Sequence, residues 1–88
     1  MMSAVFAARF YVPPVSPDSA GKEIEVFYRS PQRLGAAANA AAARRGLRDY
    51  LHAVTGVDMT AAEYIAANAS ILATRRAPRS LSMMFYNH

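Results

Sequence analysis

The sequence of 88 residues has no cysteine, no tryptophan and no long apolar run. The absence of cysteine excludes disulfide bonds, thiolate metal ligands and a cysteine nucleophile. It also fits a reducing compartment, so we expect a cytoplasmic protein. No stretch of about 18 residues is apolar and free of charges and helix breakers, and we therefore expect no transmembrane helix and no membrane partner.

Motifs that would carry a known chemistry are also missing. The sequence has no P-loop, no G-x-G-x-x-G, no H-E-x-x-H and no EF-hand loop. Asp49 and His52 could form an acid–base pair on one helix face, but that face is charged and no serine nucleophile or glycine-rich oxyanion loop accompanies them. We assign no catalytic residue, no metal site and no cofactor, and we expect a protein that is not an enzyme.

The apolar residues that are present predict a thin core. Hydrophobic residues make up 53% of the chain, but many of them are alanine, whose single methyl group buries little area. A chain of this length forms one domain, residues 1–88, with one small core. Small domains often compensate for such a core by oligomerising or by docking onto a larger assembly.

Three stretches alternate between apolar and polar residues and predict strands at residues 4–12, 22–29 and 80–86. We interpret the first stretch as a strand and not as a targeting segment, because Arg9 falls within it and no basic segment precedes it. Prolines 13 and 14 end this strand, and a loop of turn-forming residues leads to the second. We expect the first two strands to be antiparallel.

The sequence predicts a first helix over residues 32–54. Ser30 would cap it and Pro31 would occupy its first position. Seven of the residues from 36 to 43 are alanine, which has the highest helix propensity. Gly46 could end the helix, but the apolar period continues past it, and we favour one continuous helix.

A second helix is predicted over residues 61–76. Thr60 and Glu63 have the spacing of a capping box, with Asp58 as an alternative cap, and Pro78 follows the helix. The resulting order is β-β-α-α-β. It indicates an α+β fold in which a three-stranded antiparallel sheet carries two helices packed on one face.

The alanine-rich stretch predicts a surface that packs closely against a neighbour, because small side chains let another element approach. That neighbour is either the protein's own sheet or a partner, and Asn39 could hydrogen-bond across the contact. The expected interface residues are Ala36, Asn39, Ala40, Ala43 and Tyr50.

The net charge of +4 indicates an acidic partner, and all cations except Lys22 are arginine. Arginine suits bidentate contacts to carboxylate or phosphate. The expected basic patch consists of Arg44, Arg45, Arg48, Arg75, Arg76 and Arg79. We therefore expect a protein–protein interaction or assembly module that binds itself or another protein, with a small nucleic-acid-binding regulator as the alternative.

Overall fold

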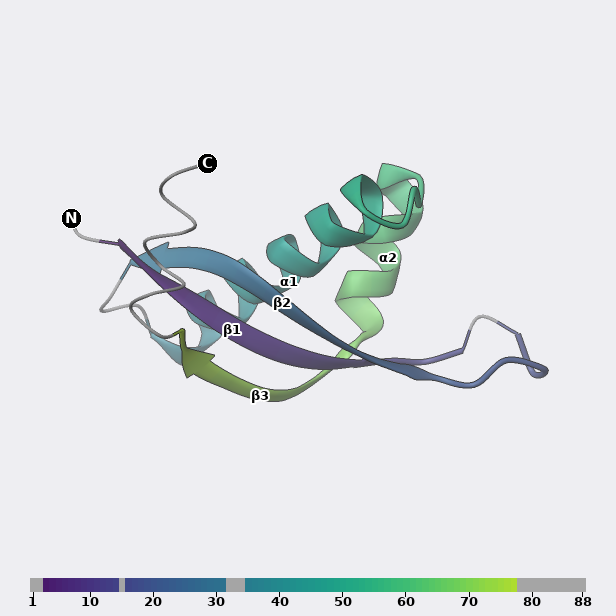
Figure 1. Cartoon of the computed structure of the whole chain (residues 1–88), viewed down its shortest axis with the longest axis horizontal. Helices are drawn as coiled ribbons and strands as arrows, with labels where there is room; N and C mark the ends of the chain where they lie inside the picture. Colours follow the sequence, from purple (N-terminus) through teal and green to yellow (C-terminus); the bar gives the residue numbers. More distant parts are fainter. Residues whose placement is uncertain (1–2, 15, 32–34, 78–88) are drawn as a thin grey trace.

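A computed structural model describes residues 3–14, 16–31 and 35–77. Its elements in chain order are β1 (Ser3–Val12), β2 (Lys22–Pro31), α1 (Ala36–Ala53), α2 (Met59–Asn68) and β3 (Ser70–Arg76). The predicted α+β class and the β-β-α-α-β order are confirmed. Both helices lie on one face of the sheet, and the connection between β1 and β2 extends beyond them (Figure 1).

The sheet has the order β2-β1-β3, and both pairings are antiparallel. The β1–β2 register is uninterrupted from Ser3 opposite Pro31 to Val12 opposite Lys22. The β1–β3 register shifts once, so that Leu72 has no opposite residue on β1. β1 is therefore the central strand, while β2 and β3 each leave one side unpaired by the described residues.

The core lies between the sheet and the helices. Its largest members are Phe10, Val26, Tyr28, Leu47 and Leu51, all buried. Among the described residues, nine of the fifteen buried apolar side chains are alanine. Each of those alanines contributes only a small buried area, so the core formed by the described residues contains few large side chains.

The first helix passes through Gly46 without interruption, as the apolar period predicts. A Cβ atom at this position would lie 3.0 Å from the Cβ of Tyr28, so glycine allows α1 to approach β2 closely. The helix ends before Gly56, whose φ of 74° lies in the left-handed region that glycine adopts readily. Of the alanine-rich stretch, Ala42 and Ala43 are buried in the protein's own core, whereas Ala36 and Ala41 are exposed.

The predicted start of the first helix is wrong. Ser30 and Pro31 belong to β2, where Ser30 is buried opposite Ala4. The helix begins at Ala36 and has no side-chain cap, since Gly35 occupies the capping position. Pairing with β1 satisfies the backbone of residues 30 and 31, which removes the need for them to start a helix.

The second half of the predicted helix over residues 61–76 is also wrong. The helix is Met59–Asn68, and residues 70–76 form β3. Pairing with the free side of β1 brings Ile71 opposite Phe10, and this tertiary pairing outweighs the local helix propensity. The predicted strand at residues 80–86 lies outside the described residues.

The alternative cap of the second helix is the one that the structure contains. The carboxylate of Asp58 accepts a hydrogen bond from the backbone N–H of Thr60 at 3.1 Å. Thr60 itself lies inside α2. A carboxylate at this end also interacts favourably with the helix dipole.

Candidate interaction site

A groove of about 700 Å³ runs between the unpaired side of β2 and the neighbouring face of α1. We call it the β2–α1 groove. Strand residues 25–29 form one wall. The helix contributes the other wall, which consists of Ala42, Arg45, Gly46, Asp49 and Tyr50.

The strand that borders the groove has the properties of a docking edge. Within the described part of the chain, no strand pairs with the outer side of β2, although β2 is ten residues long and free of bulges. Its only proline, Pro31, is its last residue. Proteins usually protect such edges with bulges, short strands or prolines, because exposed N–H and C=O groups recruit further strands.

The other edge of the sheet is protected in this way. β3 has seven residues, carries the bulge at Leu72, and ends in the consecutive cations Arg75 and Arg76. Bulges increase local twist and interrupt pairing, and a short strand offers few backbone groups to a further strand. Both edges carry charges, since β2 contains Lys22, Glu23, Glu25 and Arg29, so length and regular register distinguish them. Of the two edges, β2 is the longer and more regular one, and no described strand pairs with its outer side.

The groove combines an apolar floor with a charged rim. Val26, Tyr28 and Ala42 are buried, and Tyr50 is half-buried. The rim carries both signs of charge in the exposed residues Glu25, Arg29, Arg45 and Asp49. An apolar centre within a polar rim is the usual composition of a protein–protein interface.

A hydrogen bond inside the protein fixes the position of α1 relative to β2. The Tyr28 hydroxyl donates to Asn39 Oδ1 at 3.0 Å, and the Tyr28 ring stacks on Phe6 with a centroid distance of 5.9 Å. Burial raises the pKa of the Tyr28 hydroxyl, and the hydrogen bond with Asn39 offsets part of that rise. The cross-contact predicted for Asn39 thus exists, with the protein's own sheet as its partner.

The structure divides the expected interface residues between the interior and the surface. Ala43 is fully buried in the core, where its neighbours belong to the protein itself. Ala36 is exposed in the first turn of α1, and Ala40 is half-buried. Of the five expected residues, only Tyr50 lines the β2–α1 groove.

Arg44 has a structural position that the sequence did not predict. Its Nη1 atom donates to the carbonyl oxygens of Ala66 and Ala69, each at 2.7 Å, where α2 ends. Its guanidinium also lies 5.9 Å from the centroid of the Phe10 ring. Cations stabilise the carbonyl end of a helix, so Arg44 joins the two helices and helps to end α2.

The other arginines of the expected patch are divided between two elements. Arg45 and Arg48 lie on α1, which packs on β2 and α2, and Arg48 pairs with Asp49 at 2.8 Å. Arg75 and Arg76 lie in β3, which pairs with β1. Arg79 lies outside the described residues.

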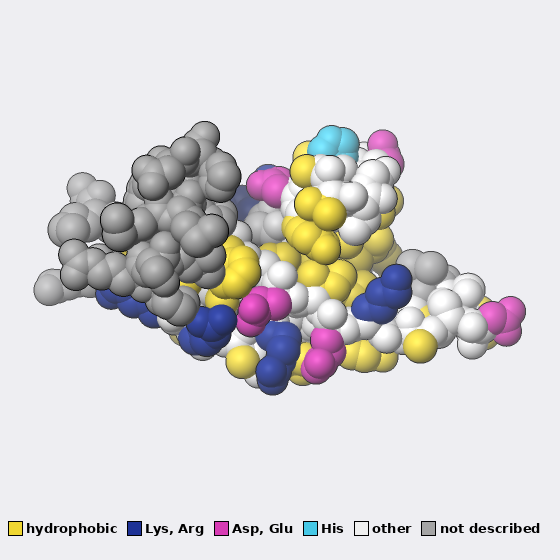
Figure 2. All heavy atoms as spheres, viewed as in Figure 1, with side chains coloured by type: hydrophobic (Ala, Val, Ile, Leu, Met, Phe, Trp, Pro, Cys, Tyr) yellow, Lys and Arg dark blue, Asp and Glu magenta, His cyan; other side chains and the backbone are white. Residues whose placement is uncertain are grey.

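Acidic side chains accompany these cations. Arg75 lies 3.7 Å from Glu25, both side chains being about half exposed, and Glu63 borders the hollow next to Arg45 and Arg48. Cationic and anionic side chains are interleaved along the sheet (Figure 2). The structure does not bring the described arginines into one uniformly basic surface, and nucleic-acid binding stays a prediction.

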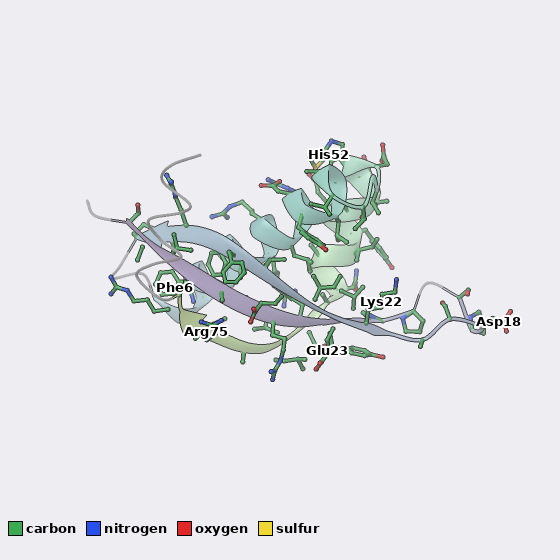
Figure 3. The ribbon with its side chains drawn as sticks, in the orientation of Figure 1. Phe6, Asp18, Lys22, Glu23, His52 and Arg75 are labelled. Atoms are coloured by element: carbon green, nitrogen blue, oxygen red, sulfur yellow. The ribbon has the colours of Figure 1, made fainter. Side chains whose placement is uncertain are left out.

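The described residues form no arrangement typical of a catalytic centre. His52 Nδ1 lies 3.0 Å from the Val57 carbonyl oxygen, whereas Asp49 pairs with Arg48. Figure 3 shows His52 at the far end of the helices from the sheet. Asp49 and His52 are both exposed and do not share a pocket.

No three histidine, cysteine, aspartate or glutamate side chains in the described part of the chain come together in a way that could hold a metal ion. Neither of the helices described combines the length and the apolar character needed to cross a membrane.

Comparisons with protein-family models, with curated proteins and with solved structures found no match to the chain.

Proposed function

We propose that the protein is a non-enzymatic interaction or assembly module that binds an extended segment of a protein partner along β2. The observation that carries this proposal is the bulge-free edge of β2 beside the β2–α1 groove, with which no strand of the described residues pairs. A strand added there would complete the backbone hydrogen bonds of β2. Alternate side chains of that strand would point toward the groove, as in other complexes formed by strand addition.

The energetics of the domain support this proposal. Each backbone hydrogen bond gained by strand addition stabilises a complex by about 1 kcal/mol net, and the apolar floor adds the burial of side chains. Nine of the fifteen buried apolar side chains among the described residues are alanine, which contribute little buried area each. A partner that covers the groove would bury further apolar surface and compensate for this thin core.

A displayed library of random peptides about twelve residues long tests the proposal, because strand addition recognises backbone as well as side chains. We expect enriched peptides whose binding changes the amide chemical shifts of residues 25–29 and of the α1 wall of the groove. Arg45→Glu should weaken this binding, since Arg45 lines the groove. Arg76→Glu makes the same change of charge on β3, outside the groove, and should have little effect.

Two results would contradict the proposal. One is a library that yields no binding peptide. The other is a set of peptides whose chemical-shift changes map to β3 or α2 and are insensitive to Arg45→Glu.

A further inference from the structure

We infer that the partner at the β2–α1 groove is a second copy of this chain, whose β2 pairs antiparallel with the first across a two-fold axis. This inference rests on the proposed function and names its partner. It follows from the distribution of charge along β2, from the contrast between the two edges of the sheet, and from the residues of α1 that border the groove.

The charges of β2 are self-complementary. Its first half carries two anions, Glu23 and Glu25, and one cation, Lys22, whereas the only charged residue of its second half is the cation Arg29. When two such strands run antiparallel, the acidic half of each lies beside the basic half of the other. A two-fold contact uses the same surface on both copies, so a strand of this kind meets its complement in a copy of itself.

Alternation of side chains restricts the register of the pair. Opposed residues must point to the same face of the joined sheet, so only residues separated by an even number of positions can face each other. We assign the register that places Phe27 opposite Phe27 of the other copy. Glu25 of each copy then lies opposite Arg29 of the other, and Val26 lies opposite Tyr28.

This register gives favourable cross-strand pairs on both faces. Aromatic pairs and opposite charges stabilise neighbouring strands, whereas like charges in opposed positions destabilise them. Shifting one strand by two residues in one direction places Glu25 opposite Phe27. A further shift of the same size places Glu25 opposite Glu25, which is repulsive.

The edge formed by β3 offers no equivalent pairing. Residues 70–76 include Arg75 and Arg76 but no acidic residue, and the bulge at Leu72 interrupts the register. Two copies of β3 side by side would therefore lack opposite charges. Self-association through the sheet is specific to β2.

The α1 helix beside the groove also carries charges that complement those of α1 in a second copy. Gly46 is the point at which α1 approaches Tyr28, so the two-fold axis passes close to the level of Gly46. The two α1 helices would run antiparallel on one face of the joined sheet. Their exposed rim residues Arg45 and Asp49 flank this level and have opposite charges, so each residue has a complement in the other copy.

The test is the solution mass of the full chain as a function of concentration, measured by light scattering for wild type and for three variants. Glu25→Arg places arginine opposite Arg29, and Arg29→Glu places glutamate opposite Glu25. Each variant alone should weaken dimerisation about tenfold or more. An equimolar mixture should restore it, because the heterodimer has both opposite-charge pairs.

The mixture separates the contact between copies from effects within one chain. Glu25→Arg also removes the contact with Arg75, but mixing does not repair a defect inside a chain. The matched control is Asp18→Arg, which makes the same change of charge at the tip of the β1–β2 connection (Figure 3) and should leave dimerisation unchanged.

The inference is overturned if wild type stays monomeric up to about 1 mM, or if the mixture associates no better than the two variants do separately. Peptides that still bind the groove of a monomeric protein would leave the proposed function standing and remove only the second copy as partner. A dimer that is insensitive to Glu25→Arg and to Arg29→Glu, together with a peptide library that yields no binder, would contradict both the proposed function and the second copy as partner.

Discussion

Replacing Gly46 by alanine tests how closely α1 packs on β2. In an exposed helix the change would stabilise the protein by about 1 kcal/mol through helix propensity. Here the new methyl carbon would lie 3.0 Å from the Cβ of Tyr28, well inside the optimal carbon–carbon separation of about 3.5–4.0 Å. The Cβ of Tyr28 is fixed to the strand backbone, so the helix or the strand must move.

Overpacking of this kind costs about 1–3 kcal/mol, which exceeds the gain in propensity. We therefore expect Gly46→Ala to lower the free energy of unfolding by about 1 kcal/mol, measured by urea denaturation at one fixed protein concentration. Ala41 is exposed in the same helix, so a substitution there measures the effect of helix propensity without a packing effect. Ala41→Gly should lower the free energy of unfolding by about 1 kcal/mol. A Gly46→Ala protein whose free energy of unfolding is higher than that of wild type by about 1 kcal/mol would refute the close approach of α1 to β2.

Three further substitutions, one of them with a matched control, test other parts of the structure. Ser30→Ala should leave stability unchanged or raise it by up to about 1 kcal/mol in urea denaturation, because within the described residues the buried Ser30 Oγ has no hydrogen-bond partner. Tyr28→Phe should cost about 1 kcal/mol at neutral pH. Because the pKa of Tyr28 is raised on folding, its hydroxyl contributes stability that is fully present below the unfolded pKa of about 10 and is lost as pH rises through the folded pKa. Wild type should therefore lose more of its free energy of unfolding between about pH 8 and pH 11 than Tyr28→Phe does. Arg44→Met should lower the urea midpoint by an amount equivalent to about 1.5–3 kcal/mol, since two charge-assisted hydrogen bonds are lost, whereas Arg48→Met removes an exposed ion pair and should cost less than about 1 kcal/mol.

The fold class could be predicted because local patterns and tertiary pairing agree over most of the chain. The alternation of residues 4–12 and 22–29 corresponds to β1 and β2. The apolar period across Gly46 correctly predicts a continuous α1. In these segments the period of the side chains and the buried face of the element indicate the same structure.

Residues 70–76 show where such prediction fails. Their helical pattern continues that of α2, and only the unpaired side of β1 makes a strand the better solution. The hydrogen bonds of Arg44 could not be predicted for a similar reason, because its partners are two backbone carbonyls more than twenty residues away. Neither contact leaves a local signal in the sequence.

The sequence predicted that the protein has an interaction site, but it did not predict where the candidate site lies. The expectation of a partner follows from the sequence, but the order β2-β1-β3 decides which strands form the edges of the sheet. The alanine-rich stretch of α1 was expected to form a closely packed contact, and its buried alanines belong to the protein's own core. Nucleic-acid binding stays a prediction, which a salt titration of binding would test.

Hydrogen exchange of the β2 amides tests the central claim most directly. Every second amide of an edge strand points away from its neighbour, and those amides among residues 23–30 gain protection when another strand pairs with them. We predict that their protection rises with protein concentration while that of residues 70–76 stays constant. Protection of β2 that is independent of concentration, or a rise confined to β3, would contradict the account.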